Sequence, residues 1–255
     1  ILIRLDQDDI SLPNRVREQV SFLLKNNSID VICSWEYVVD KNGNTIEQCK
    51  TNICNYAEFI TPVFLGLCPI WHPSLACRTQ ALRDIGGFKD LYKRAEDFDV
   101  TSRLALSRKN AAICNQFHLK VRRHRNQQSE KYKLIQKEVC KKIVNESISN
   151  FLTKEKEISD LTRFYLRDIP LKEFFRKGKI KSLNLINDAF ITSLIRKQSL
   201  NQVETRTMKN ILTNRIGWGL FYYSQYSFLP LVLQVGVFMT LSPQYVAVRL
   251  FKALI

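Results

Sequence analysis

Three carboxylates that directly follow an apolar run are the feature that most constrains this fold. The run Ile1–Leu5 is typical of a short buried strand, and Asp6, Asp8 and Asp9 come directly after it. Pro13 then indicates the first turn of a helix. A loop between a strand and a helix can hold Mg²⁺ or Mn²⁺ with one or two carboxylates and the phosphates of a substrate. Asp8 is therefore the predicted metal ligand, and Asp6 would bind the cation beside it, through a metal-bound water, or support a bound sugar ring instead. Asp9 and Ser11 could alternatively only cap the next helix.

The composition is that of a folded protein with an uneven charge. Residues 1–99 carry 11 basic and 14 acidic side chains, whereas residues 100–255 carry 28 and 10, which gives +15 overall. The basic half could face anionic lipid, nucleic acid or a phosphate-rich substrate, or form only a solvated surface. The seven cysteines are odd in number and show no CxxC spacing. We expect reduced thiols in a cytosolic compartment.

Hydrophobic periodicity predicts an α/β layer structure in the first half of the chain. The predicted helices cover residues 12–27, 55–66, 80–85 and 96–107. The predicted strands cover residues 30–39, 45–48, 70–78 and 111–121.

The hydrophobic pattern of the second half of the chain predicts helices and no further strand. The expected helices cover residues 130–152, 155–167, 170–177, 180–197 and 203–213. We therefore place a domain boundary between 1–128 and 129–255. The aromatic segment 217–241 is too polar in its first half for a spanning helix, and we favour a segment at the membrane interface over a helix packed on the domain.

Three further groups of residues could carry chemistry. Glu96 and Asp97 open a predicted helix, where they either complement the helix dipole or supply Asp97 as a general base. His72 is by itself more often a structural residue than a ligand. Arg122 and His124 end a strand, where they form a solvated basic loop or clamp a diphosphate.

In this order, the motifs resemble those of a bacterial glycosyltransferase of family 2 with the GT-A fold. The resemblance covers about residues 1–130, and the fold it implies is an incomplete Rossmann-like nucleotide-sugar transferase domain followed by a helical region. The matching stretches are Arg4–Arg15, His72-Pro73-Ser74 followed by Gly86-Gly87-Phe88, Glu96-Asp97-Phe98-Asp99, and Arg122–Ser129 with Arg122, His124, Gln127 and Ser129 in the pattern of the family.

The resemblance implies an inverting, hexosyl-transferring enzyme that moves a sugar from a nucleotide diphosphate sugar to an acceptor hydroxyl. It assigns Asp97 as the catalytic base. Asp6, Asp8, Asp9, Arg122 and His124 would bind the donor with Mn²⁺ or Mg²⁺. His72, Glu96, Gly86 and Gly87 would bind the acceptor.

The family also implies a βαβ region before the acidic loop, which this chain lacks. We therefore expect the chain to be a piece of a longer protein and to be inactive alone. The expected acceptor is a glycan or a lipid-linked sugar in surface polysaccharide or lipopolysaccharide synthesis. The expected location is the inner face of the cell membrane, with peripheral attachment to anionic lipid.

Two other functions remain open from the sequence. A truncated, non-catalytic basic module would bind anionic membrane or nucleic acid, although no nucleic-acid motif is present and the first half is acidic. We therefore expect no nucleic-acid partner. A nucleotidyltransferase of similar fold would not need the pair Glu96 and Asp97.

Overall fold

The computed structural model describes residues 1–124, 127, 131–166 and 179–212. The chain divides into two compact units, Ile1–Ser147 and Ile148–Ile255. This division lies further along the chain than the boundary expected between 1–128 and 129–255, which stays a prediction. The expected helix 170–177 and the aromatic segment 217–241 lie outside the described residues.

Six strands form one mixed sheet in the described part of the first unit, with the order β1-β5-β3-β6-β2 and with β4 paired to β3. The strands β3 and β6 run parallel, and the other pairs are antiparallel. The predicted α/β class is confirmed, and the architecture is compatible with a Rossmann-like domain followed by helices. The strands are β1 (Leu2–Ile3), β2 (Ile10–Ser11), β3 (Val31–Val39), β4 (Thr45–Cys49), β5 (Ala76–Cys77) and β6 (Ala111–Arg122).

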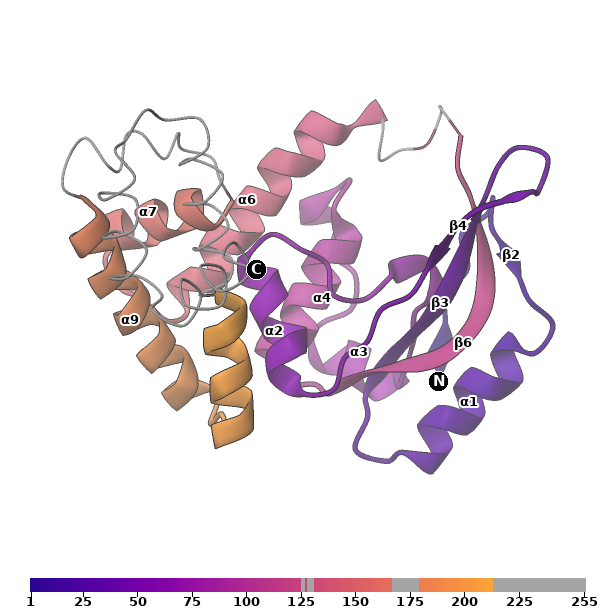
Figure 1. Ribbon diagram of the computed structural model, residues 1–255, viewed down its shortest axis with the longest axis horizontal. Coiled ribbons are helices and arrows are strands. Elements are labelled where there is room, and N and C mark those ends of the chain that lie inside the picture. The colour runs from indigo at the N-terminus through magenta and orange to yellow at the C-terminus, as the bar shows by residue number, and fades with distance from the viewer. Residues whose placement is uncertain (125–126, 128–130, 167–178, 213–255) are drawn as a thin grey trace, which may run out of the picture. The chain divides into compact units, whose positions relative to one another are not determined.

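Helices cover both faces of this sheet. Figure 1 shows α1 on one side of β3 and β6, and α2 and α4 on the other side. The apolar face of α2 is almost entirely buried, and α2 packs against α4. The helices of this unit are α1 (Arg15–Lys25), α2 (Tyr56–Phe64), α3 (Thr79–Asp84) and α4 (Glu96–Leu106), with the short turns η1 (His72–Ser74) and η2 (Asp90–Tyr92). The helix α6 (Lys133–Ser149) belongs to this unit up to Ser147.

The start of the chain differs from the sequence prediction. Ile1 and Leu5 are 46% and 50% exposed, because β1 is a two-residue strand at the edge of the sheet. Ser11 pairs with Leu119 of β6 in the sheet. The helix α1 therefore begins only at Arg15, and the expected helical turn at Pro13 is wrong.

The buried face of α1 carries Arg15, Gln19 and Leu23, spaced by four residues. Leu23 packs in one apolar cluster with Ile32 of β3, and Gln19 donates a hydrogen bond of 2.8 Å to the Ser34 hydroxyl. Four residues of a helix and two residues of a strand both rise by about 6–7 Å. Successive buried residues of α1 therefore face alternate residues along β3. Arg15, the charged residue of the three, lies nearest the acidic loop.

A polar network fixes the turn η1 and the strand β6 to β3. The Ser74 hydroxyl donates to the Ser34 carbonyl and accepts from the Ser34 amide, both at 3.1 Å. His118 joins the Ser34 hydroxyl at 2.9 Å through Nδ1, and Glu18 of α1 at 2.8 Å through Nε2. Buried polar groups with complete hydrogen bonding rigidify the fold around them.

The second unit is helical in its described residues. It contains α7 (Glu155–Tyr165), α9 (Lys179–Lys197) and a helix over residues 202–212. The Tyr165 hydroxyl donates to the Asn187 side chain at 2.5 Å, and Phe190 packs edge-on against Phe151. None of the helices described is long and apolar enough to cross a bilayer.

Candidate functional site

The acidic loop is closed on itself and joined to the end of β6. The Asp9 amide donates to the Asp6 carbonyl at 3.2 Å. The Asp9 carboxylate accepts from the Arg122 amide at 3.1 Å, and His124 Nε2 donates to the Asp8 carboxylate at 3.0 Å. The fold thus brings together all five residues that the sequence predicts for donor binding.

The carboxylates of this loop have different proton affinities. The hydrogen bond from His124 and the charges of His124 and Arg122 lower the pKa of Asp8, so Asp8 is ionised at neutral pH. Burial, together with the neighbouring charges of Asp8 and Asp6, raises the pKa of Asp9 to about 6. The loop therefore presents Asp8 as its more acidic and more exposed carboxylate.

The donor set suits a hard divalent cation. The side chains of Asp6 and Asp8 are 32% and 48% exposed, so a cation can reach their oxygen atoms. Mg²⁺ in phosphate sites is typically held by one or two carboxylates, with phosphate oxygens and water as the other ligands. Over the described ranges, no three His, Cys, Asp or Glu side chains form a metal-binding group.

Arg4 links the acidic loop to the residues predicted on the acceptor side. Its guanidinium forms an ion pair of 2.8 Å with Asp6 and donates a hydrogen bond to His72 Nδ1. The same charge acts to lower the pKa of Asp97. Arg4 therefore contacts a predicted metal ligand, and its charge acts on the predicted base.

His72 is a buried, neutral side chain. Burial, together with the charge of Arg4, lowers its pKa to about 3. Since Nδ1 accepts from Arg4, the proton lies on Nε2, which has no hydrogen-bond partner among the described residues. The ring also meets Phe88 edge-on, with 5.8 Å between centroids. The predicted acceptor-binding role of His72 stays a prediction.

Asp97 lies in the first turn of α4. Its carboxylate accepts a hydrogen bond of 2.8 Å from the Phe98 amide, and its carbonyl accepts one of the same length from the Thr101 hydroxyl. Burial raises the pKa of Asp97, although the Phe98 amide and Arg4 act in the opposite direction. A raised pKa suits a carboxylate that takes up a proton during a reaction.

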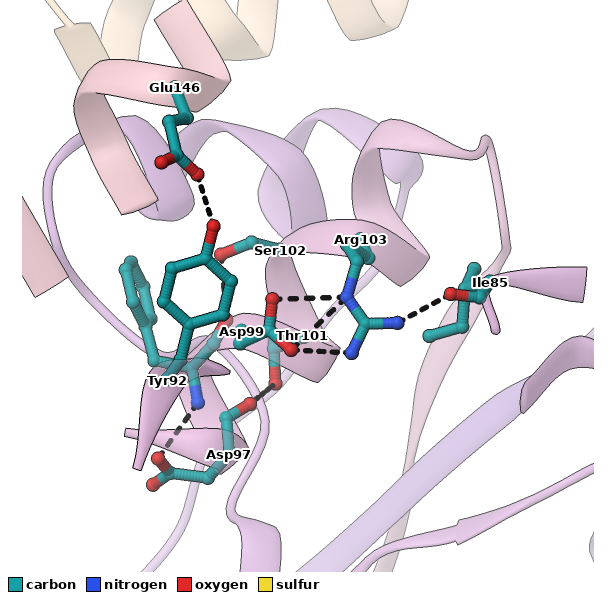
Figure 2. A network of polar contacts seen from close by, with 9 residues as sticks. Ile85, Tyr92, Asp97, Asp99, Thr101, Ser102, Arg103 and Glu146 are labelled. Carbon is teal, nitrogen blue, oxygen red and sulfur yellow. Dashed lines mark hydrogen bonds and ion pairs between the residues drawn. The ribbon is translucent and has the colours of Figure 1, made fainter. Parts of the chain in front are cut away.

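The next carboxylate of α4 has a structural task. Asp99 is 2% exposed and pairs with Arg103 through bonds of 3.0 and 2.5 Å. Arg103 also donates to the Ile85 carbonyl at 2.5 Å, which ties α4 to the end of α3. Figure 2 shows the Asp97 carboxylate pointing away from this pair. Only Asp97 of these two carboxylates is left for chemistry.

The predicted glycine turn follows directly after Ile85. Gly86 and Gly87 have φ angles of +76° and +68°, and their amides donate to the carbonyls of Arg83 and Leu82, both at 2.9 Å. Residues with side chains rarely adopt such angles. The pair therefore closes α3, and Arg103 holds this turn beside α4.

Three further residues were named in the sequence analysis: Glu96, Gln127 and Ser129. Glu96 is half-buried at the start of α4. Gln127 donates to the Arg122 carbonyl at 2.5 Å, whereas Ser129 lies outside the described residues.

The sequence analysis assigned no role to two buried charges beneath the site, Arg15 and Glu36. Arg15 is 1% exposed and donates to the carbonyls of Arg4 and Pro73 and to the Gln19 side chain. Burial raises the pKa of Glu36 to about 7, and one of its carboxylate oxygens has no hydrogen-bond partner among the described residues. The sequence signal that could have identified them is a charged residue within an apolar strand, as for Glu36, or within an amphipathic helix, as for Arg15.

Comparison with known proteins finds two relatives. A protein of Methanocaldococcus jannaschii named as an uncharacterized glycosyltransferase is 30% identical over 118 residues, which are 46% of this chain and 40% of that protein. An uncharacterized glycosyltransferase of Haemophilus influenzae is 29% identical over 167 residues, which are 59% and 49%. No family model matches the chain. The chain thus spans less than half the length of either relative, and these similarities support a glycosyltransferase family.

Proposed function

We propose that the protein containing this chain is an inverting glycosyltransferase of family 2 with a GT-A fold. It would move a hexosyl group from a nucleotide diphosphate sugar to a hydroxyl of a glycan or lipid-linked acceptor. The observation that carries the proposal is the acidic loop, in which Asp8 and Asp9 are joined to His124 and Arg122 at the end of β6. The charge of Arg4, which pairs with Asp6, also acts on Asp97 at the start of α4, and this supports a role for both carboxylates in one reaction.

Each group has a defined task in this reaction. The acceptor oxygen attacks the anomeric carbon, Asp97 takes the hydroxyl proton, and the bond from that carbon to the diphosphate breaks with its electron pair on the diphosphate. A divalent cation on Asp6 and Asp8 would neutralise the charge of the leaving group. Arg122 and His124 lie beside that loop and would bind the diphosphate.

The remaining assignments follow from the same proposal. His72, Glu96 and the turn at Gly86 and Gly87 would form the acceptor side. The product would be a surface polysaccharide or lipopolysaccharide, made at the inner face of the membrane by a peripherally attached enzyme.

The test is sugar transfer by the protein purified from its source cells, with a panel of nucleotide diphosphate sugars and Mn²⁺ or Mg²⁺. Replacing Asp97 by Asn should lower kcat by at least about 100-fold, the usual contribution of a general base. Asp90→Asn, an exposed change in η2, should leave kcat unchanged. Full activity of Asp97→Asn would refute the base assignment, and absence of transfer from every donor would refute the function.

A further inference from the structure

The beginning of α6 carries an exposed surface that combines apolar and basic side chains. Leu134 is 81% exposed, the highest value among the large hydrophobic residues of the described chain, and Ile135 is 53% exposed. Exposed lysines flank this pair on both sides. We call this surface the α6 patch and define it as Lys131, Lys133, Leu134, Ile135 and Lys137.

The α6 patch costs stability in the isolated fold. The first turn of α6 has no acidic residue, and Lys131 and Lys133 place positive charge at the end of the helix where the dipole is positive. Leu134 gains nothing from burial, because it faces water. The lysines oppose the helix dipole and Leu134 is not buried, so a binding partner explains this surface better than the stability of the fold does.

The rest of α6 is held in place through its opposite face. Ile143, Val144 and Ser147 are buried, and the Tyr92 hydroxyl donates a hydrogen bond to Glu146 (Figure 2). The first buried residue of α6 is Ile143, whereas Leu134 and Ile135 lie about two turns nearer its beginning, where no described residue of the helix is buried. The patch therefore sits on a fixed helix.

The α6 patch is connected to the proposed catalytic helix. The Arg94 guanidinium lies 4.0 Å from the centre of the Tyr132 ring, and Tyr132 lies within the sequence of the patch. Arg94 precedes Asp97 by three residues and has a φ angle of +79°, a strained conformation for a residue with a side chain. An object bound at the patch would lie close to the start of α4.

We propose that the α6 patch docks the protein on an anionic lipid surface, with Leu134 and Ile135 inserted at the interface and the lysines on the headgroups. An anionic membrane satisfies both kinds of side chain, whereas a nucleic acid would leave the apolar pair in water. This inference rests on the proposed function and deepens it: the α6 patch is the surface of the peripheral attachment, and a lipid-linked acceptor would be presented near Asp97.

The experiment is flotation of the 255-residue chain with vesicles of phosphatidylcholine alone or mixed with phosphatidylglycerol. The variant Lys131→Gln/Lys133→Gln should bind the mixed vesicles about 25-fold more weakly, since each surface lysine contributes about fivefold. Leu134→Ser/Ile135→Ser should weaken binding about tenfold or more. The matched control Leu24→Ser changes a 62% exposed leucine of α1 and should have no effect.

A direct contact measurement complements flotation. The fluorescence added by Leu134→Trp should be quenched by lipids brominated on their acyl chains, whereas the fluorescence added by Leu24→Trp should not. Unchanged flotation of both patch variants, equal binding to neutral and mixed vesicles, or no quenching at position 134 would each overturn the proposal. Sugar transfer to a water-soluble acceptor is measured separately on the complete protein. A failure of the proposed function would therefore not affect the interpretation of the vesicle binding.

Discussion

Arg4 and His72, 68 positions apart in the sequence, are joined by a hydrogen bond from the guanidinium to Nδ1 of the imidazole. Because His72 is buried and neutral, it positions Arg4 without neutralising its charge. That charge therefore remains available to Asp6, at 2.8 Å, and to Asp97. The arrangement makes Arg4 the electrostatic link between the acidic loop and Asp97.

Replacing Arg4 by Met should shift the pH dependence of sugar transfer. Arg4 lowers the pKa of Asp97, so its removal raises that pKa, and the base is then ionised only at higher pH. The acid limb of the profile of kcat/KM against pH should move to higher pH. Arg17→Met removes an exposed arginine of α1 and should leave the limb in place. An unshifted limb in Arg4→Met would contradict the link.

Replacing Arg15 by Met should destabilise the fold by about 3 kcal/mol or more, the usual cost of leaving a buried charge unpaired. The change removes the hydrogen-bond donor of the carbonyls of Arg4 and Pro73, and it removes the cation beside Glu36. Urea unfolding measures the loss.

A double-mutant cycle separates the charge interaction from packing. If Arg15 and Glu36 interact, Arg15→Met combined with Glu36→Gln should cost less than the sum of the single changes. Additive costs would show that the two charges are independent.

The sequence predicted the order of elements well, because the strands and helices of the first unit have clear hydrophobic periods. It did not predict which face of α1 is buried. Val16 and Leu24 are 57% and 62% exposed, whereas Arg15 and Gln19 lie inside. The polar residues are buried because loop carbonyls and the Ser34 hydroxyl need donors there. These requirements for hydrogen-bond donors arise only when segments that are distant in the sequence come together in the fold.

The sequence predicted only those residues of the candidate site that stand in local patterns, because contacts between distant segments are not visible in it. Asp6, Asp8 and Asp97 stand in recognisable local patterns. Arg4 interrupts an apolar run of the sequence, and its role depends on His72, which only the folded chain brings near. Likewise, the pairing of Asp8 with His124 spans 116 positions. No periodicity within one segment reports such contacts.

Replacing Glu36 by Gln should alter the pH dependence of stability. Burial raises its pKa from 4.5 to about 7, so the folded state binds its proton more tightly than the unfolded state. This contribution is full below about pH 4.5 and is lost as the pH rises through about 7.

The free energy of unfolding of Glu36→Gln, relative to the natural chain, should therefore increase between pH 5 and pH 8, by up to about 3 kcal/mol. Urea unfolding at the two pH values gives the comparison. Glu47→Gln, a change at an exposed glutamate paired with Arg123, should show no such trend. A parallel pH dependence of the Glu36 variant and the natural chain would refute the assignment.

Replacing Asp8 by Asn should raise the Mn²⁺ concentration needed for half-maximal transfer by about tenfold or more, because a carboxylate ligand of the cation is lost. Asp8 is the ionised, exposed carboxylate of its loop, so its charge is available to a cation at neutral pH. His124→Gln removes the hydrogen bond to Asp8 and should raise the requirement less. Asp90→Asn, the exposed change in η2, is the control. An unchanged Mn²⁺ requirement in Asp8→Asn would remove this residue from the metal site, whatever the effect of the variant on the maximal rate.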